Sequence, residues 1–318
     1  MRKLIKMRSY FVVGLLMFIL NPGFAQESRF IEEELKINEA IEGTLIIPDS
    51  RETESLVIFI QGSGPTDRNG NQPMMKNDGI KKIAHQLAEN GIASFRFDKR
   101  IFKMNELKLK EKDLRFDDFV NDAKDIIKYF DEDERFDNLI VAGHSQGSLV
   151  GMLAAKDMVD GYISLEGAGQ PIDNIIVEQV HKMAPPLAEN ARLAFDEIRE
   201  NGRTTSYSPM LESMFKPTIQ PFMLSWMTYD PAREIAELDI PVLIINGTAD
   251  IQVETKEAEM LKNANEDAEL VILENMNHIF RKIDSKDRLV NTKSYNEPNQ
   301  PLHPELIPVI TEFIKELE

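Results

Sequence analysis

The stretch Asn138-Leu-Ile-Val-Ala-Gly-His-Ser-Gln-Gly147 decides the fold. Residues 138–142 form a short apolar run, typical of a strand buried on both faces, and residues 146–156 carry a helical pattern. The two glycines flank Ser145 in a G-x-S-x-G pattern, where larger side chains would crowd the neighbouring strand and helix. We therefore predict a tight strand-to-helix turn that exposes Ser145 at the helix N-terminus. A glycine-rich turn that this serine merely caps is the alternative.

Outward from this turn, short apolar runs alternate with helical patterns. The other predicted strands are residues 56–60, 92–97, 162–165, 242–245 and 270–273, and the other predicted helices are 79–89, 116–130 and 253–265. This alternation indicates an α/β fold with a mostly parallel, twisted sheet flanked by helices. We expect an antiparallel strand pair at residues 30–37 and 42–47 before this core, and a helix at 304–317 after it.

Residues 170–238 interrupt the alternation. They contain helical patterns at 172–183, 187–201 and 209–215 without a convincing strand between them. We interpret this interval as a helical cap insertion that divides the core into residues 26–169 and 239–318. Three apolar side chains of the insertion are candidates for lining a substrate pocket, with packing onto the main domain as the alternative. They are Met214, Phe215 and Trp226.

The N-terminus has the pattern of a signal peptide at residues 1–25. Basic residues come first, residues 10–20 are almost wholly apolar, and small residues stand at positions 23 and 25. The apolar run is short of the ~20 residues that span a bilayer, so we expect cleavage before Gln26 and no stable membrane anchor afterwards. The predicted location is the periplasm or the extracellular space.

The composition excludes several kinds of site. The formal net charge is −17 at pH 7, and such an acidic surface repels nucleic acid. The chain contains no cysteine, so disulfides, thiolate metal sites and a cysteine nucleophile are all excluded. We predict neither a metal ion nor an organic cofactor.

Nucleophilic use of Ser145 requires a base, because a serine hydroxyl is a weak nucleophile at neutral pH. His278 follows the predicted strand 270–273 after a short polar loop, which places it at the carboxyl edge of the sheet, where ligands bind in open α/β sheets. His303, at the start of the last predicted helix, remains an alternative base.

The base in turn needs a carboxylate to orient it. Asp250 comes shortly after the predicted strand 242–245, and the chain order Ser145, Asp250, His278 fits a catalytic triad on such a sheet. The rival acid is Glu166, directly after the strand 162–165. An N-capping role for Asp250 is the structural alternative.

Backbone N–H groups should stabilise the oxyanion that forms when Ser145 attacks a carbonyl. The loop after strand 56–60 reads Gln61-Gly-Ser-Gly-Pro-Thr-Asp-Arg-Asn-Gly70, and its glycines let the backbone approach a ligand. We predict the N–H groups of Ser63 and Gln146 as the two donors. The loop lacks the spacing of a phosphate-binding loop, so we do not predict nucleotide binding.

Together these motifs resemble the α/β-hydrolase superfamily. Within it, the chain is similar to bacterial secreted esterases of the serine aminopeptidase and acyl esterase kind, whose corresponding loop resembles H-G-S-G-P-x-D-R-D-G. The resemblance covers roughly residues 30–317 and includes Phe97-Asp-Lys-Arg100 and Tyr229-Asp-Pro231. Gln61 stands where the family usually has histidine, and Ile101-Phe-Lys replaces the common glycine after Arg100.

This resemblance implies a small-molecule ester substrate. The expected reaction is hydrolysis of carboxylic esters of small to medium acyl groups through an acyl-enzyme on Ser145, with His278 and Asp250. The alternatives are an exopeptidase-like or amidase-like serine hydrolase, and a non-catalytic binding protein that retains the fold.

Overall fold

The computed structural model describes residues 30–49 and 54–318. The predicted signal peptide lies outside the described residues. The strands are β1 (Phe30–Lys36), β2 (Glu42–Pro48), β3 (Ser55–Ile60), β4 (Ala93–Phe97), β5 (Asn138–His144), β6 (Gly161–Leu165), β7 (Val242–Gly247) and β8 (Glu269–Leu273). The helices are α1 (Gly79–Glu89), α2 (Phe116–Asp131), α3 (Gln146–Ala155), α4 (Ile172–Met183), α5 (Ala188–Asn201), α6 (Glu212–Phe215), α7 (Gln220–Trp226), α8 (Pro231–Ile235), α9 (Thr255–Ala264), α10 (Arg288–Ser294) and α11 (Leu306–Lys315).

The strands form one eight-stranded sheet in the order β1-β2-β4-β3-β5-β6-β7-β8. β1 pairs with β2 and β2 with β4 in the antiparallel sense, and every pair from β4 to β8 is parallel. The predicted antiparallel pair ahead of a mainly parallel sheet is thus confirmed. All carboxyl ends of the parallel strands meet at one edge, so the loops that follow them converge there.

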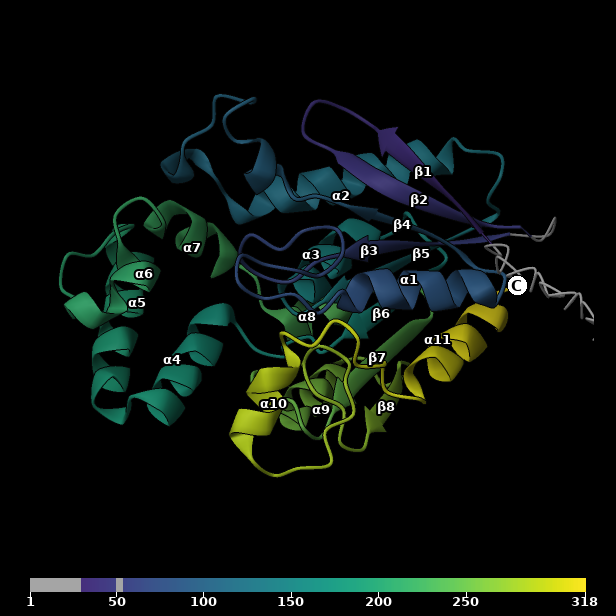
Figure 1. The fold of residues 1–318 in the computed structure, drawn as a ribbon. Helices are drawn as coiled ribbons and strands as arrows, with labels where there is room; N and C mark the ends of the chain where they lie inside the picture. The colour runs from purple at the N-terminus through teal and green to yellow at the C-terminus, as the bar shows by residue number, and fades with distance from the viewer. Residues whose placement is uncertain (1–29, 50–53) are drawn as a thin grey trace, which may run out of the picture.

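Helices cover both faces of this sheet (Figure 1). Side chains alternate along β3: Leu56, Ile58 and Ile60 pack into the core that α2, α3 and α9 cover, whereas Val57 and Phe59 pack into the core beneath α1 and α11. Every residue of β3 is buried, because both faces of a central parallel strand are covered.

Helices α4 to α8 lie between β6 and β7 in the chain, within the interval predicted as a cap. In Figure 1, α4 to α7 gather at the left, away from the end of α11. The buried Asp173 carboxylate on α4 accepts bonds of 2.7 Å from both Arg192 and Arg199 of α5. Trp226 of α7 stacks on Phe116 of α2, with ring centroids 5.4 Å apart, which attaches these helices to the core.

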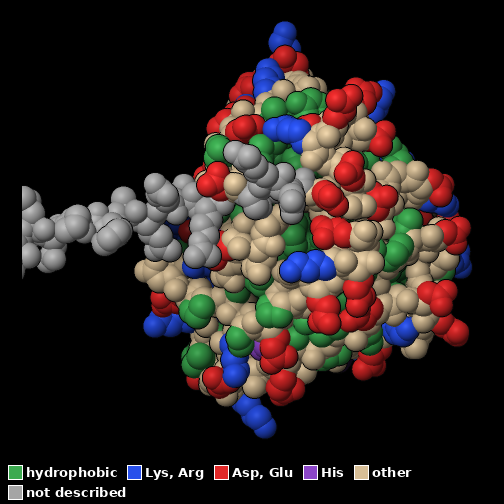
Figure 2. Space-filling view, turned by 90° about the vertical axis from the view of Figure 1, so that its right-hand side faces the viewer, with side chains coloured by type: hydrophobic (Ala, Val, Ile, Leu, Met, Phe, Trp, Pro, Cys, Tyr) green, Lys and Arg blue, Asp and Glu red, His purple; other side chains and the backbone are tan. Residues whose placement is uncertain are grey.

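The antiparallel edge of the sheet is strongly acidic. Glu32, Glu33 and Glu34 stand consecutively in β1 and are all exposed. Arg96 pairs with Glu32 and Arg68 with Glu34, each at 2.5 Å. Acidic side chains also predominate over basic ones on the face drawn in Figure 2. None of the helices in the described part of the chain is long and apolar enough to cross a membrane.

Candidate active site

Ser145 lies in the predicted turn between β5 and α3. Its φ of 54° and ψ of −118° are strained for a residue with a side chain, and such strain is common at functional sites. A Cβ atom at Gly147 would lie 2.1 Å from the carbonyl oxygen of Ile60, and one at Gly143 would lie 2.2 Å from that of Gly147. The steric reason for both glycines is therefore confirmed.

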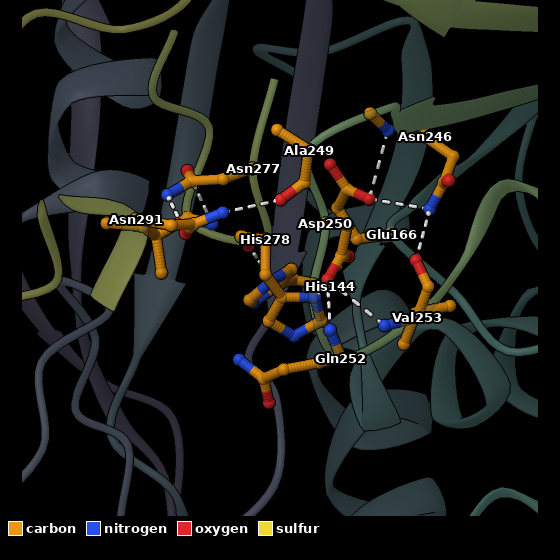
Figure 3. A network of polar contacts seen from close by, with 12 residues as sticks. His144, Glu166, Asn246, Ala249, Asp250, Gln252, Val253, Asn277, His278 and Asn291 are labelled. Carbon is orange, nitrogen blue, oxygen red and sulfur yellow. Dashed lines mark hydrogen bonds and ion pairs between the residues drawn. The ribbon is translucent and has the colours of Figure 1, made fainter. Parts of the chain in front are cut away.

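His278 and Asp250 are hydrogen-bonded to each other. His278 Nδ1 donates to Asp250 Oδ2 at 2.6 Å, and Asp250 Oδ1 accepts the N–H groups of Gln252 at 2.7 Å and Val253 at 3.0 Å (Figure 3). Burial acts to raise the pKa of Asp250, but His278 and these bonds outweigh it and lower the pKa. With its proton on Nδ1, His278 keeps a lone pair on Nε2 for a second partner.

Ser145 and His278 both line a cavity of about 320 Å³. Ser145 Oγ makes no hydrogen bond to His278, nor to any other residue in the described part of the chain. The structure thus places the three predicted residues around one edge of the sheet, with the Asp250–His278 bond formed and the His278–Ser145 bond open. Such bonds are often long or unformed in the absence of substrate.

The other histidines near this edge have different partners. His144 Nε2 donates to the His278 carbonyl oxygen at 2.9 Å, and burial lowers the pKa of His144 to about 3, so its ring is a neutral support for His278. His303 Nε2 bonds the carbonyl oxygen of Glu274 at 3.1 Å and does not line a cavity with Ser145. These positions favour His278 over His303 as the base.

Asp250 and Glu166, the two candidate acids, both lie at this edge of the sheet, with Glu166 behind Asp250. Glu166 is fully buried, and its Oε2 accepts from Asn246 Nδ2 at 2.6 Å and from the Gly247 N–H at 3.2 Å. Burial raises the pKa of Glu166 well above its ordinary value, and the negative charge of Asp250 adds to that effect. Of the two carboxylates, Asp250 is the one that bonds the His278 ring, and Glu166 lies behind it.

Glu166, Asp250 and His278 also form a compact cluster of metal-ligating types. One ligand atom from each lies within 4.8 Å of the others. Both Asp250 oxygens and one Glu166 oxygen are already hydrogen-bonded, and His278 Nδ1 carries the donated proton. These contacts favour a chain of hydrogen bonds over a metal site.

A network of side-chain hydrogen bonds, which the sequence did not predict, supports the His278 loop. Asn277 Nδ2 donates to Asn291 Oδ1 at 3.0 Å and to Ser294 Oγ at 2.9 Å, and Asn291 Nδ2 reaches the Ala249 carbonyl oxygen at 2.7 Å (Figure 3). Helix α10 thereby links the loop of the base to the loop of the acid. Amides of this kind have no sequence pattern that separates them from ordinary loop residues.

The predicted oxyanion donors line a second cavity. Ser63 and Gln146 line it together with Ser145, and its volume is about 250 Å³. Neither backbone N–H donates to another group among the described residues, so both are free to bind an oxyanion. Gln61, in place of the family's histidine, is buried and bonds only weakly back to the Phe59 carbonyl oxygen at 3.5 Å.

The second cavity is mostly apolar. Its side chains come from α3, α4 and α7, among other segments, and include Leu149, Ile172, Ile175, Ile176 and Trp226. Of the three side chains predicted to line a substrate pocket, Trp226 lines this cavity, whereas Met214 and Phe215 do not. Phe215 is fully buried against Phe195, with ring centroids 4.7 Å apart, because it packs the interior of the cap.

The sheet order, the strained serine turn and the helices inserted before β7 define an α/β-hydrolase fold. The chain belongs to the family described as serine aminopeptidase, S33, whose family model matches residues 77–281.

Relatives and solved structures agree with this fold. The chain is 26% identical over 267 residues to Esterase EstD of Thermotoga maritima, which covers 81% of this chain and 62% of EstD. It thus spans less than two thirds of that relative. Est1E from Butyrivibrio proteoclasticus has a similar structure, with a TM-score of 0.55, 16% identity, and coverage of 90% of this chain and 98% of Est1E. The Pyrococcus furiosus esterase Pf2001 gives a TM-score of 0.51 at 13% identity, over 90% of each chain.

Proposed function

We propose that this protein is a serine hydrolase that cleaves carboxylic esters of small to medium acyl groups. The observation that carries the proposal is the buried His278–Asp250 pair, whose histidine lines the same cavity as a strained, unbonded Ser145. The similarity to an esterase, EstD, supports the same reaction class.

The proposed reaction proceeds through an acyl-enzyme. A rotation of the Ser145 side chain brings Oγ to His278 Nε2, which takes the proton as Oγ attacks the ester carbonyl carbon. The N–H groups of Ser63 and Gln146 bind the resulting oxyanion, and Asp250 stabilises the imidazolium. The proton passes to the leaving alcohol, and a water molecule then releases the acid by the same steps in reverse order.

The two cavities suggest how the ester lies. His278 must protonate the leaving alcohol, and it lines the 320 Å³ cavity but not the 250 Å³ one. The alcohol therefore belongs in the first cavity, beside polar groups such as Thr66, Gln72 and Asn77. The acyl chain belongs in the second, against the isoleucines of α4.

The family description makes an aminopeptidase the second candidate. An aminopeptidase has to bind the ammonium group of its substrate, for which a carboxylate is the ordinary partner. No Asp or Glu is among the residues that line either cavity at Ser145. This absence from the described lining favours an ester over an aminoacyl amide.

The test compares hydrolysis of p-nitrophenyl acetate and butyrate with hydrolysis of aminoacyl p-nitroanilides. We expect ester hydrolysis to dominate, and Ser145→Ala to lower kcat by about 10⁴-fold or more, as loss of a triad serine does. Ser206→Ala, on an exposed cap loop, is the matched control and should retain activity. A faster reaction with the anilides would favour the aminopeptidase, and an active Ser145→Ala would remove the proposed nucleophile.

A further inference from the structure

Lys99 is a buried lysine in the Phe97-Asp-Lys-Arg100 segment after β4. Its side chain reaches under the loop that follows β3, where Nζ donates to the carbonyl oxygens of Gly62 at 2.8 Å and Gly64 at 3.1 Å. A third bond runs to Gln146 Oε1 at 3.2 Å. Lys99 is 5% exposed and forms no ion pair with a described residue. An ammonium group has three donors, and these three oxygens use all of them.

The position of these oxygens relates Lys99 to the oxyanion site. The Gly62 carbonyl and the Ser63 N–H belong to one planar trans peptide unit, in which the oxygen and the hydrogen point in opposite directions. An anchor on the Gly62 oxygen therefore fixes the direction of the Ser63 N–H. The bond to the Gly64 carbonyl oxygen holds the Gly64–Pro65 peptide, one residue further along the same loop.

The third bond reaches the other predicted donor. Gln146 is the first residue of α3, and its backbone N–H is the second group proposed to bind the oxyanion. Its side-chain oxygen is held by the same ammonium that holds the Ser63 loop. The ring of Phe119 covers Lys99 Nζ at 4.8 Å, so a cation–π contact closes the remaining side.

We propose that Lys99 is a positioning residue of the oxyanion hole, whose ammonium group fixes the N–H groups of Ser63 and Gln146 relative to each other. This inference rests on the proposed function. Burial lowers the pKa of Lys99 to about 7, and in its protonated form the ammonium group also polarises the Gly62–Ser63 peptide, which strengthens its N–H as a donor to a negative oxygen. Its effect should therefore be larger on the tetrahedral intermediate than on the bound substrate.

The kinetic test uses Lys99→Met, which keeps the length of the side chain and removes the donors. We expect kcat for p-nitrophenyl butyrate to fall about 10²-fold, the size of effect that loss of one oxyanion donor produces, with little change in KM. A trifluoromethyl ketone forms a tetrahedral adduct with a reactive serine, and its Ki should rise by a similar factor. The corresponding secondary alcohol, which has no carbonyl group and forms no adduct, should bind both proteins equally. A merely structural lysine would change both affinities together.

The control is Lys103→Met. This lysine lies one turn further along the chain and pairs with Glu42 at 2.8 Å, away from Ser145. It should leave kcat and both inhibitor affinities unchanged. Where Lys99→Met does not fold, Gln146→Leu removes one acceptor, keeps the backbone N–H, and should lower kcat by a smaller factor.

Hydrogen exchange of the loop peptide tests the anchor without any activity. Faster exchange of residues 61–72 in Lys99→Met than in Lys103→Met supports the anchoring role of Lys99. If the wild-type protein also hydrolyses no ester, the proposed function fails but the anchoring role stands. The role of Lys99 would be overturned by the following result. The wild type is active, and Lys99→Met folds with the same kcat, the same affinity for the trifluoromethyl ketone and the same hydrogen exchange.

Discussion

Two carboxyl groups stand in line behind His278. Asp250 bonds the imidazole, and Glu166 lies fully buried behind Asp250 with its Oε1 free of any other donor among the described residues. Two adjacent carboxylates in a dry site repel each other, so one of them keeps a proton. Because burial and the charge of Asp250 raise the pKa of Glu166, we predict that the proton resides on Glu166 and is donated to Asp250. The negative charge needed beside His278 remains on Asp250.

Glu166→Gln tests this assignment through stability. Above about pH 4.5, the unfolded chain ionises Glu166 while the folded protein keeps its proton, so the contribution of Glu166 to stability is lost as pH rises toward its folded pKa. The loss is up to ~1.4 kcal/mol per pH unit. Glutamine has no such proton but supplies the same donor. Relative to the wild type, the free energy of unfolding of Glu166→Gln should therefore increase as the pH rises above about 4.5 in urea titrations.

Glu166→Ala is the comparison for that experiment. It lacks the titrating proton but also leaves Asn246 Nδ2 without its carboxylate, so it should be less stable than Glu166→Gln at every pH. The kcat of Glu166→Gln should stay near that of the wild type. A stability difference from the wild type that does not vary with pH would mean that Glu166 is ionised in the folded protein.

Single residues also show how far the sequence could predict the site. Ser145 has a motif, Asp250 follows the buried strand β7, and His278 follows the apolar but partly exposed edge strand β8, so their meeting at one edge could be inferred. The stacking of Glu166 behind Asp250 could not, because it depends on a strand order that pairs β6 with β7. The packing of Phe215 against Phe195 could not be predicted, because an aromatic side chain packed between helices has the same composition signal as one in a pocket.

At the scale of elements, the contact between α3 and β3 determines the geometry of the serine turn. The helix begins so close to the strand that a Cβ at Gly147 would meet the Ile60 backbone, which has no room to move in a central strand. We expect Gly147→Ala to lower the free energy of unfolding by about 3 kcal/mol, the cost of overpacking a rigid site. Equilibrium unfolding in urea measures this difference.

Gly202→Ala is the matched control. Gly202 ends α5 with a φ of 76°, but a Cβ there would have no neighbour within 4 Å. Its replacement should cost about 1 kcal/mol, from backbone strain alone. Equal losses at the two glycines would mean that conformation, rather than the approach of α3 to β3, explains the need for glycine at 147.

Elements with a buried face were predictable, and small exposed ones were not. The continuous apolar runs located every strand from β3 to β8 within one or two residues. Helix α10 was missed because Leu289 and Val290 are 76% and 46% exposed, so no apolar period exists. It forms through the Asp287 cap on the Leu289 N–H and through the amide bonds of Asn291.

At the scale of the whole molecule, the 250 Å³ cavity lies where the cap helices meet the core. Leu149 comes from α3, whereas Ile175 and Ile176 come from α4 and Trp226 from α7. The order of layers was predictable from the alternation of strands and helices. The cavity was not, because it depends on how α4 is placed over α3, which no local pattern encodes.

Ile176→Trp should shorten the acyl cavity. Added volume at this position fills space needed by longer chains, so we expect kcat/KM for p-nitrophenyl hexanoate to fall at least about 10-fold while acetate hydrolysis changes little. The ratio of the two rates is the measured quantity.

The control for this substitution is Leu193→Trp. Leu193 lies on α5, is 59% exposed and lines neither cavity at Ser145. It should leave the ratio unchanged. An equal loss for acetate and hexanoate in Ile176→Trp would place the acyl chain elsewhere.

The acidic strand β1 affects whether separate molecules can pair through the edges of their sheets. An edge strand offers unpaired backbone groups that could recruit a strand from a second molecule and seed fibrils. Three consecutive glutamates would bring like charges face to face in any such pairing. The protein should therefore resist edge-to-edge aggregation near neutral pH, and lose that protection in acid, where the carboxylates become neutral.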